Sequence, residues 1–155
     1  MSIKRAIVSA VVMVAATAGA VAATHTSAGL SSNLLGRGTW ERPMLAEFVR
    51  ELGDAHRYGD STVAVVRATL APGGTTDWHG HPGPSVVVVT AGTIRVTEPG
   101  TGGTCVSNDY TVGDAFFHGE GAHTFINPSG ATQAEFLVTY FAPAGPLLTH
   151  DEATC

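Results

Sequence analysis

The sequence predicts an all-β domain, an antiparallel sandwich or barrel of short strands. Runs rich in β-branched residues, such as Thr62–Leu70 and Ser85–Thr90, are typical of strands. Turn signals bound these runs, because Pro72-Gly73-Gly74 follows the first and Pro82-Gly83-Pro84 precedes the second. The 155 residues include 19 glycines and 8 prolines, which favours many turns and few long helices. We therefore expect about eight or nine strands, with a turn roughly every 6–12 residues.

The remaining strands follow the same pattern in chain order. They are expected at Thr75–His81, Thr93–Thr97, Tyr110–Val112, Ala115–His118, Ala122–Asn127 and Gln133–Phe141. Pro99–Gly103 is expected to be a loop, and Pro143 and Pro146 to end the regular structure. The four consecutive valines of Val86–Val89 indicate a strand covered on both faces, or one whose outer face meets a partner such as a second copy in a homodimer.

The first 23 residues have the pattern of a secretory signal peptide. Lys4 and Arg5 precede the apolar stretch Ala6–Ala23, which ends in small residues that fit a cleavage site. An uncleaved membrane anchor is the alternative, since the stretch is nearly long enough to span a bilayer. We expect secretion or export to the cell envelope, with no membrane attachment after cleavage.

The rest of the chain is expected to form one domain with two flanking segments. Residues 24–60 are expected to form a lead-in, flexible over Thr24–Asn33, and edge elements. The apolar spacing within Leu34–Leu52 fits a short amphipathic helix or strands interrupted by turns. The barrel is expected over residues 61–146, and residues 147–155 form a C-terminal tail.

The charge of this domain bears on its partners. Beyond residue 23 the chain has six arginines, no lysine and 13 acidic residues, a formal charge of −7. Such a chain repels nucleic acid and anionic lipid, so neither is expected as a partner.

Three histidines form the strongest candidate site. His79 and His81 flank Gly80, and side chains two apart on an extended strand point to the same face. His123 begins a later strand, so pairing of the two strands would bring a third imidazole to the same place. Three neutral imidazoles suit one divalent ion such as Zn, Mn, Fe or Cu, with open positions for water.

The surroundings of these histidines resemble the two sequence motifs of the cupin superfamily. The first motif has a glycine, a His-x-His pair, a glutamate and a second glycine, and Ser85 stands where the glutamate is usual. The residues at these places are Gly74, His79-Gly80-His81, Ser85 and Gly92. The second motif is matched by Gly113-Asp114, the Gly119-Glu120-Gly121 bend, His123 and Asn127. The resemblance covers roughly Leu70–Phe141.

This resemblance implies a double-stranded β-helix, or jelly-roll, barrel with a metal ion in its mouth. The implied ligands are His79, His81 and His123, and the usual glutamate ligand is missing. The chain is similar to a group of small exported cupins that also carry two cysteines in comparable places. In this chain these are Cys105 and Cys155, and an even cysteine count in an exported chain favours a disulfide between them.

Four further residues are candidates to line the site. Asp77 and Glu120 are candidates to replace the missing carboxylate. Ser85 is a candidate lining group or holder of a ligated water, because a hydroxyl is a poor ligand unless ionised. His118 is a candidate fourth imidazole if the glycine bend turns it inward.

The sequence thus favours an exported cupin that binds a divalent metal, with its specific activity and any small-molecule ligand left open. One alternative is a metal-dependent oxygenase of a small organic substrate. Another is a ligand-binding or structural barrel that has lost its metal. The sequence names neither the metal nor the substrate, and whether the protein is an enzyme stays open.

Overall fold

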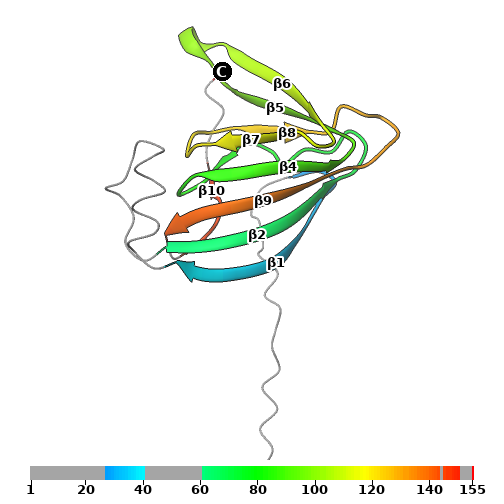
Figure 1. Cartoon of the computed structure of the whole chain (residues 1–155). Helices are drawn as coiled ribbons and strands as arrows, with labels where there is room; N and C mark the ends of the chain where they lie inside the picture. Colours follow the sequence, from blue (N-terminus) through cyan, green and yellow to red (C-terminus); the bar gives the residue numbers. More distant parts are fainter. Residues whose placement is uncertain (1–26, 41–60, 144, 151–154) are drawn as a thin grey trace, which may run out of the picture.

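A computed structural model describes residues 27–40, 61–143, 145–150 and 155 (Figure 1). Within these ranges the chain forms ten strands and no α-helix. The signal peptide expected over residues 1–23 lies outside the described residues. So does the part of the expected amphipathic helix that follows Trp40.

The strands succeed one another along the chain with short connections. They are β1 (Leu30–Trp40), β2 (Ser61–Leu70), β3 (His79–Gly80), β4 (Ser85–Ala91), β5 (Thr93–Pro99), β6 (Cys105–Thr111), β7 (Ala115–His118), β8 (Thr124–Ile126), β9 (Ala134–Pro143) and β10 (Thr149–His150). A short 3₁₀ turn, Thr101–Gly103, joins β5 to β6.

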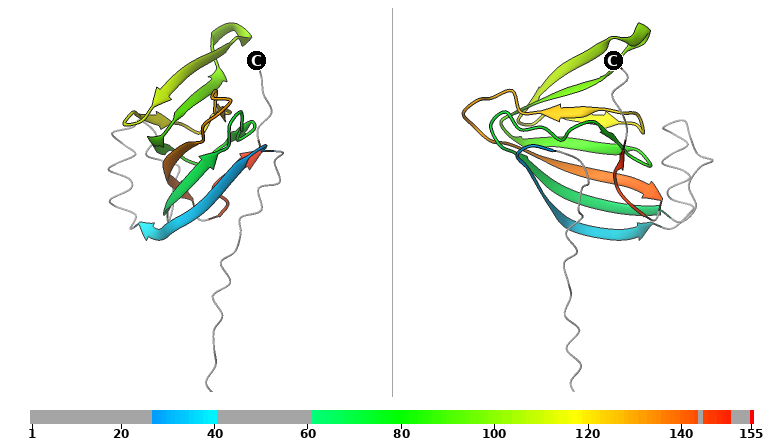
Figure 2. Two further views of the ribbon diagram at one scale, coloured as in Figure 1. Left: turned by 90° about the vertical axis from the view of Figure 1, so that its right-hand side faces the viewer. Right: turned by 180° about the vertical axis from the view of Figure 1, so that it is seen from behind.

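The strands form two main antiparallel sheets and one short pair. One sheet has five strands in the order β1-β2-β9-β4-β7, the other has three in the order β6-β5-β8, and β10 pairs with β3. Views from two further sides show the β5–β6 hairpin and β1 at opposite ends of the molecule (Figure 2). The predicted all-β jelly-roll barrel is confirmed.

Alternation along the strands builds the core between the sheets. In β9 every second residue from Ala134 to Ala142 is buried, and β2 lies beside it over ten antiparallel pairs. The buried apolar residues include Leu70, Val87, Val89, Ile94, Val96, Phe125, Phe136 and Val138. Burying each large side chain stabilises the fold by about 1.5–3 kcal/mol.

The valine run in β4 follows the same alternation. Val87 and Val89 are buried in the core, whereas Val88 on the outer face is 38% exposed. Phe117 of β7, which pairs with Val86, is 52% exposed. The run is therefore not covered on both faces by the described residues, and its burial by a second copy stays a prediction.

The prediction of a strand over Thr75–His81 is wrong for most of this segment, because the backbone turns at Asp77. This residue has a φ of 60°, a left-handed conformation that Asp tolerates better than most residues. Asp77 Oδ1 accepts a hydrogen bond from the backbone N–H of Trp78 at 2.9 Å, and Thr75 Oγ1 accepts one from that of Asp77 at 3.0 Å. Only His79–Gly80 forms a strand.

Three other boundaries differ from expectation. β6 begins at Cys105, five residues before the expected start. The sequence did not predict this part of the strand, because its residues are almost all exposed and show no alternation of apolar and polar side chains. β10 lies beyond Pro146, where regular structure was expected to end. Part of the expected lead-in and helix, Leu30–Trp40, is strand β1 at the edge of the larger sheet.

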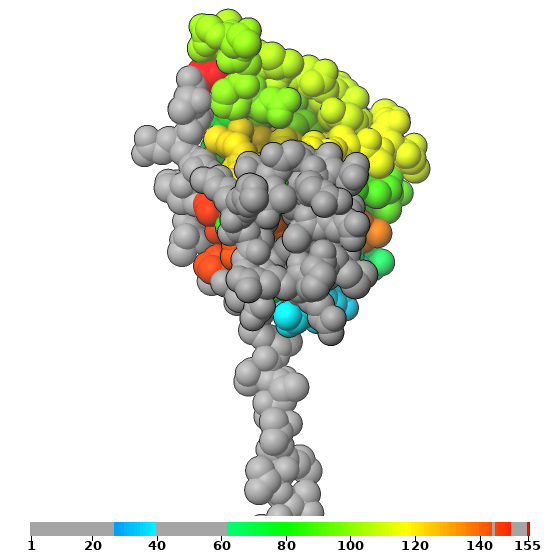
Figure 3. All heavy atoms as spheres, turned by 60° about the vertical axis from the view of Figure 1, so that its left-hand side comes forward, coloured from blue at the N-terminus to red at the C-terminus, as the bar shows by residue number. Residues whose placement is uncertain are grey.

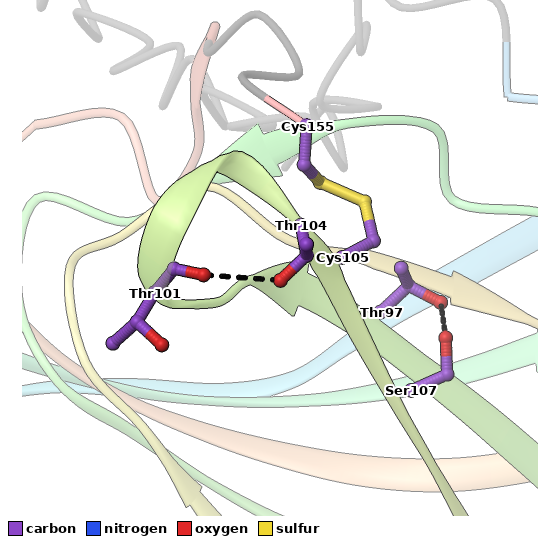
Figure 4. The surroundings of a disulfide bond; sticks show 6 residues. All are labelled: Thr97, Thr101, Thr104, Cys105, Ser107 and Cys155. Carbon is purple, nitrogen blue, oxygen red and sulfur yellow. Dashed lines mark hydrogen bonds between the residues drawn. A yellow bond between two sulfur atoms is a disulfide. The ribbon is translucent and has the colours of Figure 1, made fainter.

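The predicted disulfide between Cys105 and Cys155 is confirmed. Their Cα atoms lie 5.3 Å apart, at the start of β6 (Figure 4). In the space-filling view, β5 and β6 form the green end of the molecule (Figure 3). Among the described residues, none belongs to a helix with the length and hydropathy that crossing a membrane requires.

Candidate metal centre

His79, His81 and His123 meet inside the barrel. The backbones of His79 and His123 form an antiparallel bridge, with N–H to carbonyl distances of 2.9 Å and 2.8 Å. His81 follows His79 by two residues, and its Nε2 lies 3.1 Å from Nε2 of His123. The three side chains are 6%, 4% and 0% exposed, in chain order.

Each imidazole is held by a backbone carbonyl through Nδ1. Nδ1 of His79 lies 2.9 Å from the carbonyl of Asp77, that of His123 lies 2.8 Å from Gly121, and that of His81 lies 3.3 Å from Leu147. A carbonyl can only accept, so each Nδ1 carries the proton and donates. The lone pair of each neutral ring is therefore on Nε2.

Burial keeps the rings of His81 and His123 neutral. Desolvation, followed by repulsion from His79, lowers the pKa of His81 to about 3 and the pKa of His123 to about 2. Two neutral rings that both carry their proton on Nδ1 present two lone pairs to each other across 3.1 Å. That contact is repulsive unless a cation lies between the nitrogens.

The three residues fit a divalent metal ion. Their ligand atoms all lie within 4.8 Å of one another. Imidazole nitrogens bind Zn²⁺ at about 2.0–2.1 Å, so two ligands of one ion lie roughly 3–4 Å apart. Carbonyls that orient the second ring nitrogen are the usual support of histidine ligands. The arrangement therefore has the tautomers, the spacing and the support of a three-histidine metal site.

A row of three inward side chains lies beside this cluster. In the five-stranded sheet, Ser85 of β4 is paired with His118 of β7 on one side and with Tyr140 of β9 on the other. His118 stacks on His123, with ring centroids 3.8 Å apart and planes 24° apart. The centroid of the Tyr140 ring lies 4.9 Å from the centroid of the His81 ring. Ser85 thus lies between two residues whose rings contact His123 and His81.

Ser85 is completely buried, and Oγ has no hydrogen-bond partner among the described residues. An unpaired buried hydroxyl costs about 1–3 kcal/mol of stability. Buried hydroxyls in proteins are nearly always paired, so Ser85 Oγ is suited to hold a bound molecule.

The other candidate residues contribute no ligand atom to the three-histidine group. His118 is buried, and burial followed by repulsion from His79 lowers its pKa to about 4. Its stacked orientation leaves it outside the group of converging ligand atoms, and the carboxylates of Asp77 and Glu120 do not belong to that group either. The structure thus supplies no carboxylate to the cluster from the described residues.

Sequence reasoning missed two contributors. Leu147 acts through its carbonyl, which no sequence pattern marks. Tyr140 lies in β9, where alternate residues face inward. A tyrosine at an inward-facing position of this predicted strand could have marked it as a contributor to the site. The described arginines Arg37, Arg67 and Arg95 are all exposed, so none of them adds positive charge to the buried cluster.

Comparison with known proteins gives structural matches alone. No family model matches the chain, and no curated protein matches it. An oxalate oxidase in complex with glycolate is 25% identical over 78% of this chain, with a TM-score of 0.54. A second oxalate oxidase structure is 25% identical over 77% of this chain, with a TM-score of 0.53. This chain spans only 54% of each of those chains.

A cupin domain from Bordetella pertussis is 32% identical to this chain. The match covers 51% of this chain and 80% of that domain, with a TM-score of 0.43. The double-sheet barrel and the matches to the two oxalate oxidases lead to one conclusion. The chain has the jelly-roll fold of the cupin superfamily.

Proposed function

We propose that this protein is an exported cupin that binds one divalent metal ion through Nε2 of His79, His81 and His123. The observation that carries the proposal is the shared orientation of the three rings. Each Nδ1 donates to a backbone carbonyl, and one ligand atom from each ring lies within 4.8 Å of those of the other two. When bound, the ion would supply a Lewis acid with open positions for a small molecule.

Two observations support binding of a small molecule beside the ion. His118, Ser85 and Tyr140 line one side of the cluster with polar groups, and such groups orient ligands in otherwise apolar sites. One oxalate oxidase with a similar fold is described in complex with glycolate. A small organic acid is therefore the ligand class that we propose, without assigning a reaction.

Elemental analysis tests the metal proposal. The protein should be purified without a histidine tag, beside the double variant His79→Ala/His81→Ala and a matched control, His118→Phe. We expect about one metal ion per chain in the wild type and in the control, and none in the double variant. Absence of metal from the wild type, even after dialysis against Zn, Mn, Cu and Fe salts, would overturn the proposal.

Whether the protein catalyses a reaction is tested separately, by measuring oxygen uptake. The metal-loaded protein should be supplied with oxalate and glycolate in an oxygen electrode. Uptake that the double variant lacks would make the protein an oxidase or oxygenase. No uptake, with binding retained in a calorimeter, would make it a binding protein.

The export proposal rests on the amino-terminal pattern and on the disulfide. A disulfide persists in oxidising compartments, and the structure contains one between Cys105 and Cys155. Mass spectrometry of the protein from the culture fluid and the cell envelope tests it. We expect a chain shortened by about the length of the signal segment, whereas a full-length chain in the membrane fraction would indicate an anchor.

A further inference from the structure

We propose that Ser85 is the hydrogen-bond donor for a small exogenous carboxylate that takes the place of the missing glutamate. This rests on the metal site of the proposed function. It adds a specificity-determining residue to that site and names the class of ligand that it holds.

The first step of the argument is charge. The group of converging ligand atoms consists of three histidine nitrogens, and none of the described carboxylates belongs to it. A divalent ion held by these nitrogens, with no carboxylate from the described residues beside it, would keep two positive charges in a buried place. Burial of unpaired charge is costly, so an anion from solution is favoured beside the ion.

The second step is position. The register of the larger sheet places Ser85 between His118 and Tyr140. Those two side chains contact His123 and His81, so Ser85 faces the space that the metal ligands enclose. A serine hydroxyl is a poor metal ligand unless ionised, so at this place it serves as a hydrogen-bond donor.

The third step is the unsatisfied hydroxyl. Ser85 Oγ is fully buried and has no partner among the described residues, so its O–H is available to donate. A carboxylate has two oxygens, and it can accept from Ser85 with one while the other faces the ion. A chloride ion is a single atom, so it has no second acceptor atom to face the metal while the first accepts from Ser85.

The experiment uses the full chain loaded with Co²⁺, whose visible spectrum reports changes in its ligands. Formate is the probe, and its dissociation constant is measured by titration at fixed ionic strength. The variants are Ser85→Ala, which is nearly isosteric, and Ser85→Glu, which restores the internal carboxylate. Ser107→Ala is the matched control, because it removes an exposed hydroxyl from β6. Bound metal is measured in every sample.

We expect formate to change the wild-type and Ser107→Ala spectra alike. In Ser85→Ala, formate should bind at least about tenfold more weakly while the metal content stays the same, since a hydrogen bond to a charged group is lost. In Ser85→Glu, formate should no longer change the spectrum, and Co²⁺ should bind more tightly.

Four results would overturn the inference. Equal formate affinity in wild type and Ser85→Ala would remove the role of Ser85. Loaded protein that ignores formate would sink the inference and leave the metal site standing. Chloride that binds as tightly as formate would refute the carboxylate class. Failure of the chain to take up any metal would reject the proposed function together with the inference.

Discussion

The carbonyl of Leu147 lies 3.3 Å from Nδ1 of His81, although the two residues are 66 positions apart in the chain. Leu147 is buried in the core, and β10 follows it to pair with β3, the strand of His79. Cys155, a few residues further on, is tied to β6 by the disulfide. The C-terminal segment therefore orients one histidine of the candidate metal site.

Loss of the disulfide should weaken metal binding as well as stability. The double variant Cys105→Ser/Cys155→Ser is expected to lose about 2–4 kcal/mol of unfolding free energy, because the bond constrains the unfolded chain. Its Zn²⁺ affinity should fall by about tenfold, because the carbonyl that orients His81 is less firmly held. Urea unfolding and a competitive zinc titration measure the two effects. Reduced wild type should behave like the variant, and a stability loss with unchanged affinity would contradict the coupling.

Asp77→Asn should keep the metal. The carboxylate of Asp77 accepts a hydrogen bond from Trp78 in its own loop and does not join the ligand group. Asn also tolerates the left-handed backbone of this position. Elemental analysis should find the same metal content as in the wild type. A drop to zero would instead make Asp77 the replacement for the missing glutamate.

Asn127→Asp should destabilise the barrel by about 2–4 kcal/mol. Nδ2 of Asn127 lies 3.2, 3.0 and 2.8 Å from the carbonyls of Leu70, Ala71 and Thr132, and the side chain is fully buried. An aspartate would turn a second acceptor oxygen toward these acceptors. Thermal unfolding measures the loss, and Ser107→Ala, which removes only an exposed hydrogen bond to Thr97, should change the midpoint little. An unchanged midpoint in Asn127→Asp would refute the role of this contact.

The metal-free protein should lose stability as the pH falls below about 6.5, the ordinary histidine value. The pKa values of His81, His118 and His123 are lowered to about 3, 4 and 2, so the unfolded chain takes up protons before the folded one does. Stability is therefore full above pH 6.5 and is lost progressively below it, by about 1.4 kcal/mol per pH unit for each histidine.

Urea unfolding between pH 7.5 and pH 5 checks this dependence. The variant His118→Phe should show a shallower slope, because one of the titrating groups is removed. A wild-type unfolding free energy that stays constant over this range would show that the histidines are not buried in the neutral form.

Strand runs and turn signals predicted most of the barrel, because its inward positions alternate with outward ones. They failed where that alternation is absent. The residues of β6 are almost all exposed, so Cys105–Asp109 carries no apolar pattern. At Asp77 a single left-handed residue breaks a segment whose composition is that of a strand.

The candidate site was predictable in part for a similar reason. His79, His81 and His123 belong to a spaced motif, and the structure brings them together. The carbonyl of Leu147 and the row through Ser85 arise from register and tertiary packing. No local residue pattern encodes contacts of that kind.

Contacts in the three-histidine site join residues that are far apart in the sequence, and this determines when the site forms during folding. His81 meets His123 across 42 residues and Leu147 across 66. A nascent chain that has released only its first histidines from the ribosome has no cavity of three imidazoles, and contacts of this range form late in folding. Uptake of the proposed metal ion would thus follow folding of the whole barrel. If the chain crosses a membrane unfolded, as proposed, the ion would come from the compartment where folding finishes, and the supply there would decide which metal is bound.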